Sequence, residues 1–446
     1  MLVLLVFCLF VVAVVAGEPI SRPRSISIPI QKVQSSIPNG ELLPAFIKHQ
    51  QHVNYCDQRL AFMQGRPPLL QSVLRDSILA HIPESSQGQD REDHAEKLST
   101  QANDIGYYGP VELGNPPSLF QLLMDTGSAD MWVGAEDCRC DDGGACGNHS
   151  FLGPHSSKSF VGTNESWIIW YGTGEVSGFL AHDVVSIMGL TLKPHKFGVA
   201  QNESADFTAY ELAFYLFFLF IYVSCFRDSI PFDGLLGLAQ TAASRQKTRT
   251  VVEALYETRQ IEDAVVSFKI SRAADEKNDG ELMLGGMNLS KFQPDTAVTV
   301  KNENNRGFWE VPLDDIMVNG ESLGLLNRSA VLDTGSTLIL AQAKDVASIH
   351  QRIPGARFDQ GSWIIPCQTR AVVSFVIGGR QFPIDSRDLR FSYVDENNAE
   401  DCISGISRGR ELLEGPTHWL VGDVFLKNVY HSLNSRTNEI TLAYLK

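Results

Sequence analysis

The sequence lacks the features that nucleic-acid-binding and membrane-spanning proteins need. It has no basic excess: 37 Lys and Arg stand against 52 Asp and Glu, for a formal net charge of -15. Because phosphate binding needs a basic surface, this chain is not expected to bind nucleic acid. Its two long uncharged apolar runs, 2–15 and 213–226, have only 14 residues each, too few to cross a bilayer. A hydrophobic content of 43% excludes wholesale disorder.

The sequence also lacks a metal-binding pattern. No His or further Cys stands at zinc spacing around the cysteines at 138, 140 and 146, so neither a metal nor a cofactor is expected. The run 2–15, followed by Ala16 and Gly17, fits the apolar region of a signal peptide, although a positively charged start is missing. Five glycosylation sequons favour a secreted, extracellular protein rather than a vacuolar one; they are Asn148, Asn164, Asn202, Asn288 and Asn327.

Charge divides the chain into a leader and a body. After an expected signal peptide, 1–17, residues 18–98 hold nine basic and nine acidic residues before the body, which carries the whole net charge. From 22 to 75 there are seven basic and two acidic residues. The stretch 43–63 is rich in helix formers, and 84–97 is polar and suits an exposed, cleavable connector. We interpret 18–98 as a pro-segment; an ordinary N-terminal domain is the alternative.

The body, from residue 99 onward, reads as mostly β. Short apolar runs alternate with turns rich in Gly, Asn, Asp and Ser, and few segments have helical periodicity. The clearest strands are 107–113, 119–124, 167–171, 265–270, 281–284, 330–332, 372–377 and 440–444, and the clearest helices are 251–259 and 344–352.

A repeated motif carries the chemistry. Leu122-Leu-Met-Asp125-Thr-Gly-Ser128 recurs 208 residues later as Ala330-Val-Leu-Asp333-Thr-Gly-Ser336, which suggests two homologous lobes. In each copy an apolar strand leads to a carboxylate on a tight loop, where Gly allows a positive φ and lets backbone amides approach. A single copy would be an ordinary turn. Two carboxylates that meet across a lobe interface share one proton, which leaves one acid and one base at acidic pH.

These motifs resemble those of the pepsin-like aspartic endopeptidases, most of all the secreted fungal enzymes of the polyporopepsin type. The resemblance covers 105–446, and the pro-segment stretch 46–54 is similar to that of fungal zymogens. It implies a bilobal pepsin-like acid protease fold, with two homologous β-barrel-like lobes around a central cleft, here 99–285 and 286–446. It also implies that Asp125 and Asp333 are catalytic and hold a water between them.

Other site residues follow from the same resemblance. The segment 170–174 resembles the flap that closes over substrate, in which Tyr171, Gly172 and Thr173 would cover and bind it. Trp132 would be the partner of the flap tyrosine. Thr126 and Thr334 would lock the two loops together, beside Ser128 and Ser336, while Gly127, Gly335 and Thr337 would line the cleft. The segments 232–238 and 419–423 would support the two loops. Disulfides are implied for Cys138–Cys146 and Cys367–Cys402, which leaves Cys140 over.

The apolar run 213–226 does not fit this pattern. Removing about 211–229 restores the junction expected for the family, so we interpret this segment as a translated intron or another gene-model error. A real surface insertion is the alternative, although such an exposed patch would be prone to aggregation.

The sequence therefore predicts a monomeric, secreted aspartic endopeptidase that is made as a zymogen. Its partners would be protein and peptide substrates, with bulky apolar residues beside the scissile bond, and its own pro-segment as inhibitor. We expect Lys48 or another basic residue of 22–75 to pair with the cleft carboxylates at neutral pH and to be released by acid. Two alternatives are a catalytically impaired homologue that binds peptides and a membrane-anchored receptor or channel; stable membrane anchoring is not expected.

Overall fold

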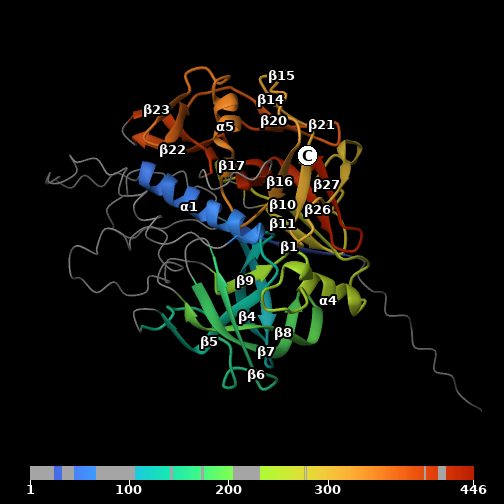
Figure 1. Ribbon diagram of the computed structural model, residues 1–446. Helices are drawn as coiled ribbons and strands as arrows, with labels where there is room; N and C mark the ends of the chain where they lie inside the picture. The colour runs from blue at the N-terminus through green and yellow to red at the C-terminus, as the bar shows by residue number, and fades with distance from the viewer. Residues whose placement is uncertain are drawn as a thin grey trace, which may run out of the picture.

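The fold is seen in a computed structural model, which describes part of the chain. The described residues are 25–32, 45–66, 106–140, 144–171, 175–203, 232–275, 277, 279–395, 398–409 and 418–446. The expected signal peptide, the connector 84–97 and the suspected insertion 211–229 lie outside them. The described chain is mostly β, as the sequence predicts, with strands on both sides of helix α1 (Figure 1).

The first lobe is built on an eight-stranded sheet in the order β2-β3-β4-β9-β5-β8-β7-β6. Strand β3 alternates buried and more exposed residues along its length, which is the pattern of a sheet with one face on the core. The strands are β2 (Gln31–Lys32), β3 (Tyr107–Leu113), β4 (Ser118–Asp125), β5 (Met131–Cys140), β6 (Val161–Trp170), β7 (Glu175–Ile187), β8 (Leu190–Glu203) and β9 (Gly234–Gly237).

The second lobe contains a five-stranded sheet, β13-β16-β25-β17-β24, and two four-stranded sheets, β15-β14-β20-β21 and β18-β19-β23-β22. The five-stranded sheet comprises β13 (Glu310–Leu313), β16 (Arg328–Leu332), β17 (Ile339–Ala341), β24 (Ile406–Arg408) and β25 (His418–Val421). The others comprise β14 (Asp315–Val318), β15 (Glu321–Ser322), β18 (Arg357–Asp359), β19 (Ser362–Pro366), β20 (Val373–Ile377), β21 (Arg380–Ile384), β22 (Arg390–Asp395) and β23 (Asn398–Ser404).

A six-stranded sheet, β1-β11-β10-β26-β27-β12, joins the two halves of the chain. Its strands are β1 (Ile26–Pro29), β10 (Val265–Lys269), β11 (Glu281–Leu284), β12 (Val298–Lys301), β26 (Val429–Asn434) and β27 (Glu439–Tyr444). Strands β10 and β11 precede the expected lobe boundary at 285, whereas β26 follows that boundary. Because β10 pairs with both β11 and β26, the sheet crosses the boundary. The N-terminal segment adds β1 at one edge, so it is part of this sheet.

Helices are few and short apart from α1 (Ala45–Met63). The others among the described residues are α4 (Val251–Glu257), α5 (Ala343–His350) and α6 (Asp423–Leu426), with 3-10 turns η4 (Thr241–Ala243), η5 (Ala273–Asp275) and η6 (Pro294–Thr296). Thr250 is the N-cap of helix α4. Its side chain accepts a hydrogen bond from the Glu253 amide, which satisfies one unpaired amide donor of the first turn. Within the ranges given above, no helix combines the length and apolarity needed to cross a membrane.

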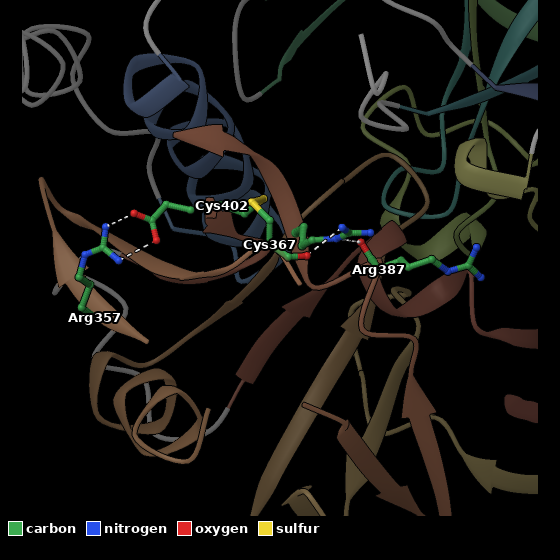
Figure 2. Close-up of a disulfide and its surroundings, with 6 residues drawn as sticks. Arg357, Cys367, Arg387 and Cys402 are labelled. Atoms are coloured by element: carbon green, nitrogen blue, oxygen red, sulfur yellow. Dashed lines mark hydrogen bonds and ion pairs between the residues drawn. A yellow bond between two sulfur atoms is a disulfide. The ribbon is translucent and has the colours of Figure 1, made fainter. Parts of the chain in front are cut away.

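Two disulfides join residues at or near the ends of strands. Cys138 and Cys146 are bonded at one end of β5, and Cys367 and Cys402 join the end of β19 to β23. Figure 2 shows the second disulfide with Arg357 and Arg387 on either side of it. Cys140, which the sequence left over, is also disulfide-bonded, so its thiol is not the spare one. The free cysteine among the described residues is Cys56, buried on α1.

Candidate active site

The two Asp-Thr-Gly-Ser motifs lie on equivalent loops in the two lobes. Asp125 ends β4, which runs parallel to β9, and β9 pairs in turn with β5. Asp333 follows β16, which runs parallel to β25, and β25 pairs with β17. The repeat in the sequence is therefore a repeat in topology. The segment 232–238 contains β9, and 419–423 contains all of β25 but its first residue, so both lie beside the strands that lead to the two aspartates.

The two loops are joined by a symmetric set of hydrogen bonds. The Thr126 amide donates to Thr334 Oγ1 at 3.0 Å, and the Thr334 amide donates to Thr126 Oγ1 at 2.9 Å. Each hydroxyl then donates across the interface, Thr126 to the Leu332 carbonyl and Thr334 to the Met124 carbonyl, at 3.0 and 2.7 Å. All four residues next to the dyad are thus fixed by the opposite lobe, which holds the two carboxylates at a set separation.

The glycines of the motifs are required for space. Both lie outside the positive-φ region, contrary to the expectation from sequence. A Cβ on Gly127 would lie 2.4 Å from Asp333 Oδ1, and a Cβ on Gly335 would lie 2.5 Å from Asp125 Oδ1. Each glycine amide also donates to the carboxylate of its own loop, at 3.0 Å to Asp125 and 2.9 Å to Asp333. Any larger residue would push the carboxylates apart.

Serine hydroxyls complete the support of each carboxylate. Ser128 and Ser336 donate to Oδ2 of Asp125 and Asp333, both at 2.5 Å. Both aspartates have no exposed surface. Burial raises the pKa of Asp125 above its usual value, and the Asp333 carboxylate acts in the same direction, although Arg59 opposes both. One carboxyl group of the pair is thereby favoured to hold a proton at acidic pH.

Helix α1 lies between the two lobes (Figure 1), and it contacts both aspartates. Burial extends around much of the helix, since all five residues from 53 to 57 are buried, and it includes the polar side chains of Asn54 and Asp57. The remaining buried side chains of the helix are mostly apolar. They pack in a cluster with residues from both lobes; the helix contributes Phe46, Val53, Tyr55, Cys56, Leu60 and Met63. Further along, the ring of Phe62 meets Phe308 edge-on, with 6.0 Å between the ring centres.

Arg59 of this helix binds both aspartates. Its Nη2 donates to Asp125 Oδ1 at 2.6 Å and to Asp333 Oδ1 at 2.8 Å, and its Nε donates to Asp333 Oδ2 at 2.7 Å. Burial alone would lower the pKa of Arg59, but Asp125 and Asp333 outweigh burial and raise it well above its usual value. The Tyr55 hydroxyl accepts from Arg59 Nη1 at 3.2 Å and donates to the Gly335 carbonyl at 3.0 Å.

Sequence reasoning did not single out Arg59. It expected Lys48 or another basic residue to reach the cleft, and Arg59 and Lys48 are the two Lys/Arg residues of α1. A usable signal was present, because Arg59 borders the apolar face of the helix and lies one turn after Tyr55. Which of the two cations reaches the aspartates depends on how the helix packs in the cleft. That packing is a tertiary contact, which the helix sequence alone does not fix.

The flap strand also bears on the site. Tyr171 follows β6 and is buried, and its hydroxyl accepts a hydrogen bond from Trp132 Nε1 at 2.8 Å. This is the pair that the resemblance implies. Gly172 and Thr173 lie outside the described residues. Thr337 is buried in the loop after β16, where its carbonyl accepts from the Val424 amide at 3.1 Å.

The described residues offer one group of close metal-ligand atoms, those of Cys138, Cys146 and Glu203. The two sulfurs are bonded to each other, so neither can act as a thiolate ligand. This group carries no metal chemistry.

Comparison with known proteins agrees with this geometry. Residues 106–445 match the family described as "Eukaryotic aspartyl protease". A "Probable aspartic-type endopeptidase CTSD" of Arthroderma benhamiae is 32% identical over 351 residues, 78% of this chain and 63% of that protein. "Pepsin-2B" of Gadus morhua is 30% identical over 347 residues, 77% of this chain and 96% of that protein. The match thus spans under two thirds of the fungal relative's length. The chain belongs to the eukaryotic aspartyl protease family.

Proposed function

We propose that this protein is an aspartic endopeptidase in which Asp125 and Asp333 activate a water against a peptide bond. One observation carries the proposal: a single nitrogen, Arg59 Nη2, lies within 2.8 Å of an oxygen from each aspartate. Two carboxylates close enough to share one nitrogen are close enough to share one water. Their matched loops and buried surroundings supply the acid and the base that this chemistry needs.

In the proposed mechanism a water takes the place of Arg59 Nη2. The ionised aspartate removes a proton from the water, which attacks the peptide carbonyl, and the protonated aspartate donates its proton to the carbonyl oxygen. The tetrahedral diol then collapses: the newly ionised aspartate takes a proton from one of its hydroxyl groups, and the other aspartate donates its proton to the amide nitrogen as the C–N bond breaks, which restores both carboxyl groups. No covalent link to the enzyme forms. The hydrogen bonds from Gly127 and Ser128 to Asp125, and those from Gly335 and Ser336 to Asp333, hold both carboxyl groups in fixed positions. Little reorganisation is therefore needed during the reaction.

We also propose that the protein is a secreted zymogen. Support for latency comes from α1, which fills the space over the dyad and neutralises it with Arg59. Support for secretion comes from the signal-like run 2–15, the disulfides and the sequons, of which four present an exposed asparagine to solvent; these are Asn148, Asn164, Asn202 and Asn327.

Acid-triggered hydrolysis of a peptide tests the proposal. The full chain, purified near neutral pH, is expected to cleave a fluorogenic peptide only after exposure to acid, with a shorter chain appearing in parallel. A transition-state analogue with a hydroxyl group should block this activity, because its hydroxyl would sit between the two carboxylates. A shortened chain that binds the analogue without cleaving any peptide would instead identify a peptide-binding homologue.

The pH of release depends on His49 of α1. Its two ring nitrogens lie 2.8 and 2.7 Å from the hydroxyls of Ser362 and Ser407, and its ring edge packs on Phe391. Burial, and then the neighbouring His52, lower the pKa of His49 to about 3. The docked helix therefore holds His49 neutral, whereas a released histidine titrates near pH 6.5. Docking is strongest above about pH 6.5 and weakens as pH falls toward about 3, by about 1.4 kcal/mol per pH unit.

His49→Gln keeps a side chain that can bond both hydroxyls but removes this titration. We expect conversion of the full chain at about pH 4.5 to slow by roughly 10- to 100-fold relative to the wild type. His155→Gln is the matched control, since that histidine side chain is 92% exposed in the first lobe. Equal conversion rates for His49→Gln and wild type across the whole pH range would show that His49 does not set the release, and would leave it to His52, whose pKa burial lowers to about 4, and to the carboxylates.

A further inference from the structure

A cavity of about 510 Å³ remains in the cleft beyond the last turn of α1. The flap strand β6 lines one side of it through Trp170 and Tyr171. Phe62 and Gly65 of the N-terminal segment line another side. The body of the protein contributes Arg245, just after η4, and Arg306, just before β13. No described residue that lines the cavity is acidic.

Both body arginines hold the N-terminal segment. Arg306 Nη1 donates to the Gln64 carbonyl at 3.2 Å, and a Cβ on Gly65 would lie 2.2 Å from the same guanidinium. The Arg245 guanidinium carbon lies 4.5 Å from the centre of the Phe62 ring, a cation–π contact. Two cations of the body therefore contact the segment that occupies this end of the cleft.

Neither guanidinium forms an ion pair with a carboxylate of the described residues. Asp130, the nearest candidate for Arg245, already accepts hydrogen bonds from the Ser244 hydroxyl and from the amides of Arg245 and Gln246. Both arginines have exposed side chains at the cleft rim. When α1 leaves, the rim keeps two exposed guanidinium groups: Arg245 feels the buried Asp130 carboxylate without forming an ion pair with it, and Arg306 forms no ion pair with a described carboxylate.

We infer that Arg245 and Arg306 form a subsite that selects an acidic side chain in the substrate. Arg306 contacts Gly65, which lies six residues after Arg59 in the sequence. Since Arg59 is bonded to both aspartates, its position gives the position of the dyad. The helical part of the separation between Arg59 and Gly65, from Arg59 to Met63, is about 6 Å at about 1.5 Å per residue, and the turn residues Gln64 and Gly65 extend it further. An extended substrate rises about 3.3 Å per residue, so the selected position is about three residues from the scissile bond, on one side only. This inference rests on the proposed endopeptidase activity and adds a substrate class to it.

Paired peptides test the subsite on the acid-converted full chain. Each pair carries Glu or Gln at the third residue on one side of the scissile bond, and two pairs cover the two sides. For one side we expect kcat/KM for the Glu peptide to exceed that for the Gln peptide by about three- to tenfold at about pH 5. The ratio should approach one near pH 3, where the glutamate side chain is protonated, because its usual pKa is about 4.3.

Charge-removal variants locate the effect. Arg306→Gln and the double variant with Arg245→Gln should bring the Glu-to-Gln ratio to about one at both pH values. Lys247→Gln removes a charge from the same loop outside the cavity lining, and it should keep the wild-type ratio. A wild-type ratio of one on both sides, or a ratio that survives the double variant, overturns the subsite. Failure of the proposed function would look different, since neither peptide of a pair would be cleaved.

Discussion

Asp125→Asn and Asp333→Asn are each expected to lower kcat for peptide hydrolysis at acidic pH by about 10³- to 10⁴-fold. The amide can neither remove a proton from the water nor donate one to the carbonyl in the way that a carboxyl group does. Each change also removes the negative charge that makes the pair share one proton. The measurement is single-turnover cleavage of a fluorogenic peptide by chain that has been converted with wild-type enzyme and then repurified.

The fold should survive both substitutions. In each case Asn Oδ1 can still accept from the glycine amide of its loop, and the serine hydroxyl, at 2.5 Å, can rotate to accept from the new amide nitrogen. In Asp333→Asn that nitrogen also faces Arg59 Nε, which weakens the contact of α1 with the loop but leaves the packing of the body unchanged. Asp183→Asn is the matched control: this aspartate is buried in the first lobe, and its Oδ1 accepts from Ser159 and Val184. Activity above about a tenth of wild type in either dyad variant, with Asp183→Asn also active, would contradict the assignment.

The fold was predictable where one face of a strand is buried. The run 107–113 coincides with β3, and 281–284 with β11, because alternating burial leaves a clear pattern. The run 167–171 fell short of β6, which begins at Val161. Five of the first six residues of β6 are exposed, so they carry no apolar pattern, and pairing with β7 makes them a strand. Edge strands of this kind are fixed by their neighbour.

The candidate site was predictable where the motif is local. Asp125, Asp333 and the two threonines could be picked out because each copy of the motif is a short continuous segment. The positive φ expected for the two glycines was wrong, whereas the expected approach of their amides to the carboxylates is confirmed. The close approach of the opposite carboxylate could not be expected from sequence. Arg245 and Arg306 were missed for the same reason, since 61 residues separate them and only the fold brings them to one rim.

Arg59→Met is expected to abolish latency. Methionine keeps most of the length and apolar contact of the arginine stem but removes the cation that bridges the dyad. Removing one partner of a buried ion pair costs about 3–5 kcal/mol, because the remaining charges stay buried without compensation. The affinity of the docked helix for the cleft should therefore fall by about 10²- to 10⁴-fold. The readout is the initial rate of peptide hydrolysis by the full chain at about pH 6, before conversion and without acid treatment.

Arg59→Lys separates the charge of this residue from its geometry. Lysine keeps the positive charge, but one ammonium group cannot reproduce the fork in which Nε and Nη2 bind Asp333 while Nη2 also binds Asp125. Latency between those of wild type and Arg59→Met would mean that both charge and fork hold the helix. Full latency in Arg59→Lys would assign the effect to charge alone. Full latency in Arg59→Met would instead place the inhibition in the contacts of α1 that this substitution leaves intact, which are its apolar packing and the hydrogen bonds of His49 and Tyr55 to the body.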